Sequence, residues 1–102
     1  MATRKERRRA FEVKLAGMRA AYVRDLPDRI AAMRASAAAG DYREVARLAH
    51  ALRGTGGSYG LRELVSPTLA LEEACEQSDD DAVREHLDAI EALAEAFRAP
   101  LD

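Results

Sequence analysis

Apolar residues recur every three or four positions through the first third of the chain. The positions are Phe11, Leu15, Met18, Tyr22, Leu26, Ile30 and Met33. This spacing predicts an amphipathic α-helix with one apolar stripe. Pro27 lies within the stripe without changing its phase. Because proline removes one helical hydrogen bond and crowds the preceding turn, the pattern predicts either one kinked helix or two nearly collinear helices that meet near Asp25.

The residues that follow predict where this helix ends and the next begins. Gly40 suits the left-handed conformation that often follows a helix. Asp41 suits an N-cap, and Glu44 three residues later completes the pattern of a capping box. The second helix should run from Tyr42 toward a cluster of glycines, which weaken helix propensity sharply. These are Gly54, Gly56, Gly57 and Gly60.

Two further helices are predicted after the glycines. One spans Leu61 to Gln77 and is perturbed at Ser66-Pro67, and the polar residues 78–81 supply the N-cap of the last helix. The last helix carries an apolar stripe before Pro100, formed by Val83, Leu87, Ile90, Ala94 and Phe97. Short connections imply antiparallel neighbours. We therefore predict an all-α fold, an antiparallel up-and-down four-helix bundle with an additional N-terminal helical segment, in a single domain over residues 1–102.

Composition and charge narrow the class of protein. The chain is 48% apolar and 33% charged, which favours helices, and its formal net charge of -2 predicts no strong attraction to nucleic acid or membrane. The single Cys75 forms no internal disulfide and has no partner at zinc-ligand spacing, so we interpret it as a small core residue. No apolar run approaches the roughly 20 residues of a membrane span, and no signal peptide follows the N-terminus. We expect a cytoplasmic protein.

The N-terminus is strongly basic, with five basic residues from Arg4 to Arg9. We interpret residues 1–10 as a basic N-terminal extension, in its simplest form a frayed and solvated helix start. The alternative is a segment that docks on nucleic acid or on an acidic partner.

His50 is the candidate reactive side chain of the second helix. At about 100° per residue, Val45, Leu48, Ala49 and Leu52 form the buried side of that helix. His50 lies roughly 150° from the centre of this stripe and therefore faces outward. The residues that share its direction or flank it are Arg43, Arg47, Arg53, Gly54 and Gly57.

This arrangement suits an imidazole that accepts a phosphoryl group. A neutral ring nitrogen is a nucleophile, and it needs in-line access to the phosphorus. A glycine at 54 leaves that approach open, while Arg47 and Arg53 can attract an acidic partner and bind phosphate oxygens. Taken singly, an exposed histidine such as His86 is usually a solvated surface residue, and glycines usually mark a turn. The joint placement around His50 favours a functional role.

Residues 50–61, with the sequence HALRGTGGSYGL, resemble the signature of the histidine-containing phosphotransfer (HPt) family. In that signature, the phosphorylated histidine is followed by an apolar residue two positions on, a basic residue, a glycine, and another glycine six further. The resemblance also includes Leu26-Pro27, Gly40-Asp41 and Leu71-Glu72, and it covers about residues 11–97.

The resemblance implies a four-helix bundle that relays phosphate from aspartate to histidine to aspartate. It assigns His50 as the phosphoacceptor, Arg53 as the basic partner and Gly54 as the clearance glycine. The helical wheel, rather than the resemblance, adds Arg43, Arg47 and Gly57 as candidate binding residues. The chain differs from the usual pattern in having arginine at 53 where lysine is commoner, a large Tyr59, and Pro67 in the following helix.

The function that follows is a phosphocarrier without autokinase activity, because the sequence has no glycine-rich phosphate-binding loop for ATP. The expected partners are receiver domains of a hybrid histidine kinase or a response regulator, with Mg²⁺ held by the receiver and no cofactor in this chain. We expect a monomer that binds neither nucleic acid nor membrane, and the initial Met and compact length predict a free-standing protein. The alternative function is a non-catalytic helical adaptor, a degenerate HPt protein, against which the intact His50 and Gly54 argue.

Overall fold

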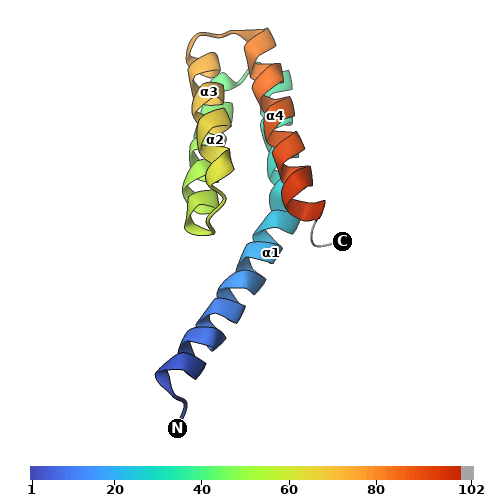
Figure 1. Ribbon diagram of the computed structural model, residues 1–102. Coiled ribbons are helices and arrows are strands. Elements are labelled where there is room, and N and C mark those ends of the chain that lie inside the picture. The colour runs from blue at the N-terminus through green and yellow to red at the C-terminus, as the bar shows by residue number, and fades with distance from the viewer. Residues whose placement is uncertain (100–102) are drawn as a thin grey trace.

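The computed structural model describes residues 1–99, which form four α-helices and one short 3₁₀ helix (Figure 1). The elements are α1 (Arg4–Ala38), α2 (Tyr42–Ser58), η1 (Arg62–Leu64), α3 (Val65–Glu76) and α4 (Asp80–Arg98). Each α-helix packs on the next, and α4 packs back on α1. This closed order of contacts makes an up-and-down bundle, and residues 1–99 include no strand. The predicted all-α bundle is confirmed.

The first helix is a single continuous element that includes Pro27, so of the two predicted alternatives one helix forms rather than two. It begins at Arg4, because Thr3 acts as the N-cap and its Oγ1 accepts a hydrogen bond from the Glu6 N–H at 3.1 Å. The basic segment from Arg4 to Arg9 is therefore part of α1. The additional N-terminal helical segment is the first half of α1.

The apolar stripe of α1 is buried over only part of its length. Tyr22, Leu26, Ile30 and Met33 are in the core, whereas Phe11, Leu15 and Met18 are 66%, 39% and 46% exposed. The exposed half, residues 4–18, extends beyond the end of the bundle at which α2 turns into α3 (Figure 1). The molecule accordingly measures 57 × 25 × 19 Å. We call residues 4–18 the arm.

The core lies between the four helices. It is formed mainly by residues that the periodicity of each helix places on one face, including Val45, Ala49 and Leu52 of α2 and Val83, Leu87, Ile90 and Ala94 of α4. Leu61 and Leu64, at the α2–α3 connection, are fully buried beneath the end of α2. A Cβ atom on Gly56 would lie 2.8 Å from Leu64 Cδ1. Gly56 therefore permits the close approach of α2 to η1.

The predicted boundary between the first two helices is confirmed. Gly40 adopts a left-handed φ of 73°, and the Asp41 N–H donates to the Ser36 carbonyl at 2.9 Å. Asp41 Oδ1 in turn accepts from the Glu44 N–H at 3.2 Å and caps α2. The Glu44 carboxylate pairs with Arg47 rather than with the cap, so only one half of the predicted capping box forms.

Three of the four clustered glycines lie inside α2, and Gly60 ends it. Gly60 has a φ of 75°, and the Leu61 N–H donates to the Gly56 carbonyl at 2.9 Å. The predicted helix from Leu61 to Gln77 is divided into η1 and α3. Pro67 lies in the first turn of α3, where backbone N–H groups have no helical acceptor, so it does not interrupt the helix.

The last helix begins where the polar residues predict. Asp79 is the N-cap, and its Oδ1 accepts from the Ala82 N–H at 3.1 Å. The helix ends at Arg98, and Pro100 lies outside the described residues. No helix in residues 1–99 is long and apolar enough to cross a membrane.

Candidate functional site

His50 lies near the middle of α2 on the face that points away from the core. Its side chain is 75% exposed, whereas its neighbour Ala49 is fully buried. This difference follows from the 100° step between successive helical residues. The helical periodicity therefore predicted the orientation of His50 correctly.

Two charged side chains contact the same nitrogen of the His50 ring. An Nη2 atom of Arg53 lies 2.9 Å from Nδ1, and Glu72 Oε1 lies 3.4 Å from the same atom. No hydrogen-bond partner for Nε2 occurs among residues 1–99. The ring is thus oriented through Nδ1, and Nε2 is the nitrogen that is open to an incoming group.

The two contacts to Nδ1 require different tautomers of a neutral ring. A guanidinium only donates hydrogen bonds, so the Arg53 contact requires a lone pair on Nδ1 and places the ring proton on Nε2. A carboxylate only accepts, so a hydrogen bond to Glu72 requires the proton on Nδ1 and leaves the lone pair on Nε2. The Arg53 and Glu72 side chains can therefore hold the ring in either tautomer.

Arg53 and Glu72 also form an ion pair that joins α2 to α3. Their side chains are 19% and 25% exposed, so this pair is more shielded from solvent than His50. The sequence assigns Glu72 no role, although the Leu71-Glu72 pair is part of the resemblance to the HPt family. A signal was available, since Glu72 is a charged residue next to the core residue Leu71, but periodicity alone does not say which side chain of α2 it meets.

The glycines of α2 have different surroundings. A Cβ atom on Gly54 or Gly57 would meet no atom within 4 Å, so both positions border open space beside or beyond His50. Gly56, by contrast, is buried and in close contact with Leu64. The packing around α2 therefore leaves space for a side chain at 54 and at 57.

The predicted binding arginines lie on the exposed surface of α2. Arg43 is exposed, and the Arg47 side chain is 67% exposed. Arg47 forms a hydrogen-bonded ion pair with Glu44, which lowers the pKa of the Glu44 carboxyl. Part of the positive charge of Arg47 is therefore neutralised locally. Arg53, which also contacts Nδ1, is the cation nearest to the ring.

Tyr59 is larger than the residue that the family usually has at this position, but it packs away from His50. Its ring centroid lies 5.1 Å from that of Tyr22, and its carbonyl accepts from Arg19 Nε at 3.2 Å. These contacts attach the end of α2 to α1 and leave the access to His50 unaffected. Tyr42 is likewise a packing residue, and its hydroxyl donates to Asp80.

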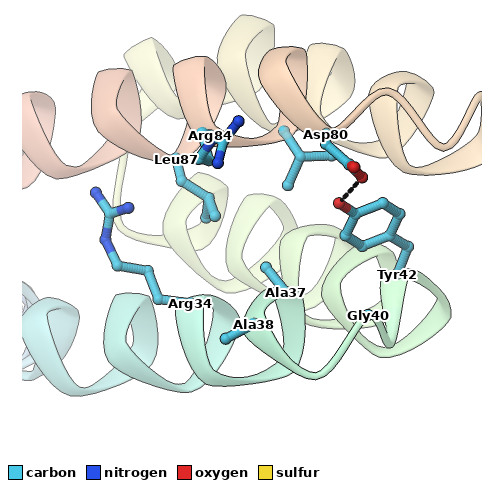
Figure 2. Close-up of a pocket in the computed structure, with 9 residues that line it drawn as sticks. Arg34, Ala37, Ala38, Gly40, Tyr42, Asp80, Arg84 and Leu87 are labelled. Carbon is cyan, nitrogen blue, oxygen red and sulfur yellow. Dashed lines mark hydrogen bonds between the residues drawn. The ribbon is translucent and has the colours of Figure 1, made fainter.

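A separate pocket of about 530 Å³ lies between the end of α1, the start of α2 and α4 (Figure 2). Its lining includes two guanidinium groups, but both are already paired: Arg34 with Asp88 and Glu91, and Arg84 with Asp81. None of the predicted site residues lines it. The pocket therefore adds nothing to the chemistry of His50.

Comparison with known proteins identifies the family of the chain. The chain matches the family model of the Hpt domain over residues 17–100, which leaves most of the arm outside the match. No curated protein and no solved structure gives a significant match. Because the family model covers most of the chain, this protein belongs to the Hpt domain family, whose role is histidine phosphotransfer in phosphorelays.

Proposed function

We propose that the protein relays a phosphoryl group between the aspartates of receiver domains through a phosphohistidine at Nε2 of His50. The observation that carries this proposal is the exposed imidazole whose Nδ1 contacts Glu72 and Arg53, while Nε2 has no hydrogen-bond partner among residues 1–99. A nucleophile must have an available lone pair and an open approach, and Nε2 has both when the proton is on Nδ1.

The transfer step balances without any added reagent. The Nε2 lone pair attacks the phosphorus of the partner's aspartyl phosphate, and the bond from phosphorus to the carboxylate oxygen breaks with its electron pair on that oxygen. The Nδ1 proton stays on the ring, and the carboxylate of Glu72 stabilises the positive charge that the ring acquires. The receiver domain is expected to supply Mg²⁺, which would neutralise charge on the transferring phosphoryl group. The second transfer is the same step in reverse.

Arg53 changes partners during this cycle in our proposal. In the unphosphorylated protein, it contacts Nδ1 and Glu72. When Glu72 accepts a hydrogen bond from Nδ1–H, the guanidinium is released from the ring and can bind phosphoryl oxygens, which it is well shaped to contact in pairs. Gly54 keeps the turn above the ring clear, so that the surface of the receiver can approach.

The test is incubation with a panel of phosphorylated receiver domains, followed by intact-mass measurement. We expect one added phosphoryl group on the wild-type chain and none on His50→Gln, which should keep its helical circular dichroism because the side chain is exposed. His86→Gln is the matched control and should be labelled normally. Acid-labile labelling that persists in His50→Gln would show that the phosphoacceptor is another residue, and absence of labelling from every receiver would favour the adaptor function.

A further inference from the structure

The arm presents an apolar stripe that nothing in the described chain covers. Phe11, Leu15 and Met18 continue the stripe of α1 beyond the bundle and remain 39–66% exposed. The arm has 15 residues, or about 22 Å of helix at 1.5 Å per residue. Exposed apolar residues scattered singly are common, but three on successive turns of one helix face are typical of a surface that packs on another helix.

Basic residues border this stripe. By the 100° step of the helix, Arg7, Arg8 and Lys14 lie within about 70° of the stripe centre, whereas Glu6 and Glu12 lie about 90° or more away. Residues 1–19 contain seven basic and two acidic side chains, a net charge of +5. The rest of the chain contains nine basic and sixteen acidic side chains, a net charge of -7. The arm is therefore complementary in charge to the body of its own chain.

The exposed face of α3 has the opposite pattern. Val65 and Leu69 are 41% and 49% exposed, and they lie one turn apart. Glu73 and Glu76 follow on the same face at helical spacing, and both are exposed. Neither forms an ion pair within residues 1–99. We call Val65, Leu69, Glu73 and Glu76 the α3 face. It offers apolar side chains with acidic neighbours, where the arm offers apolar side chains with basic neighbours.

We propose that the arm of one copy packs on the α3 face of a second copy. The contact is intermolecular because α1 is one continuous helix, so the arm cannot fold back onto its own bundle without breaking. Two arms are poor partners for each other, since each carries a net charge of +4. A flat membrane surface is also a poor partner. The stripe of the arm lies on the same face of α1 as the core residues Tyr22 and Leu26, so the bundle occupies the side of α1 on which a bilayer would have to lie.

This proposal replaces the monomer expected from the sequence, which did not take the exposed stripe into account. The α3 face adjoins Glu72, so self-association would also obstruct the approach to His50. That consequence rests on the proposed function. The self-association itself does not, and the experiment below measures it without any phosphotransfer.

The test is sedimentation equilibrium of the full chain from micromolar to millimolar concentration. We expect the average mass to rise from 11.2 kDa toward twice that value, and to rise less at high salt because exposed charges are screened. Leu15→Ser should weaken association about tenfold. Val13→Ser is the matched control, because Val13 is 68% exposed but lies on the opposite side of the helix from the stripe, and it should have no effect.

Charge reversal identifies the partner of the arm. One variant carries Arg7→Glu and Arg8→Glu, and the other carries Glu73→Arg and Glu76→Arg. Each alone should stay at the monomer mass with unchanged helical circular dichroism, and an equimolar mixture should associate, because each reversed surface then meets its complement. If the Glu73→Arg and Glu76→Arg variant alone associates as strongly as the wild type, the proposal is overturned in favour of pairing between arms. A wild-type chain that stays monomeric at every concentration would also overturn it, and arm-dependent binding of that monomer to phosphatidylglycerol vesicles would assign the arm to a membrane instead.

Discussion

Gly54→Gln tests whether glycine at 54, one turn after His50, serves access to the His50 ring or only lowers the stability of α2. Gly54 lies inside α2, and a Cβ atom there would meet nothing within 4 Å. Replacing a helical glycine with a good helix former should therefore raise the free energy of unfolding by about 0.5–1 kcal/mol. For a domain of this size, that gain corresponds to a rise in Tm of roughly 2–8 °C.

The same change should slow phosphotransfer. Side chains on a helix lie over the preceding turn, so a glutamine at 54 would extend toward the His50 ring and the surface of the incoming receiver. We expect a loss of about tenfold or more in the rate of transfer, which corresponds to about 1.4 kcal/mol in the barrier. Gly54→Ala should keep the gain in stability with a smaller loss of rate, because a methyl group does not reach the ring.

The measurements are a thermal melt by circular dichroism and the rate of transfer from a phosphorylated receiver, both on the same preparations. Gly56→Ala is the opposite control: its Cβ would lie 2.8 Å from the buried Leu64, so we expect a lower Tm despite the better helix propensity. If Gly54→Gln transfers phosphate as fast as the wild type, glycine at 54 does not serve access, and the reasoning is refuted.

Three other predictions concern Glu72, Arg47 and Cys75. Glu72→Ala should slow transfer about tenfold through loss of a charge-assisted hydrogen bond, and it should shift the ring toward the Nε2–H tautomer in ¹⁵N NMR spectra. Glu72→Gln should restore part of the transfer rate and part of the Nδ1–H tautomer. An unchanged tautomer ratio in Glu72→Ala would contradict this prediction. Arg47→Glu should slow transfer and weaken the dependence of the transfer rate on salt, because exposed charges act over about 10 Å at 0.1 M ionic strength. A transfer rate that Arg47→Glu leaves unchanged at every salt concentration would indicate docking through apolar contacts. Burial, with a smaller contribution from Glu72, raises the pKa of the Cys75 thiol, so less thiolate is present at pH 8. Iodoacetamide should therefore alkylate Cys75 more slowly in the native chain than in the unfolded chain. Equal alkylation rates, measured by mass spectrometry, would disprove the burial of Cys75.

The fold could be predicted from the sequence because its main determinants are local. Helix ends follow from single residues, such as Gly40 with its positive φ and Asp79 as an N-cap. The orientation of His50 also follows from the periodicity of its own helix. The exposure of Phe11 and Leu15 could not be predicted in this way, because a stripe shows which face of a helix is apolar but not how far the neighbouring helices extend along it.

The choice of nitrogen in the His50 ring is a tertiary property, and this is why sequence reasoning stopped short of it. Arg53 and His50 are three residues apart on α2, so their contact is local, and it alone would place the ring proton on Nε2. Glu72 comes from α3, and its position opposite the ring depends on where Gly60 ends α2 and on how η1 turns the chain into α3. Among residues 1–99, this non-local carboxylate is the only acceptor in contact with Nδ1 and can hold the proton there. In the proposed function, the nucleophilicity of His50 therefore depends on the connection between α2 and α3 as much as on the residues around it in α2.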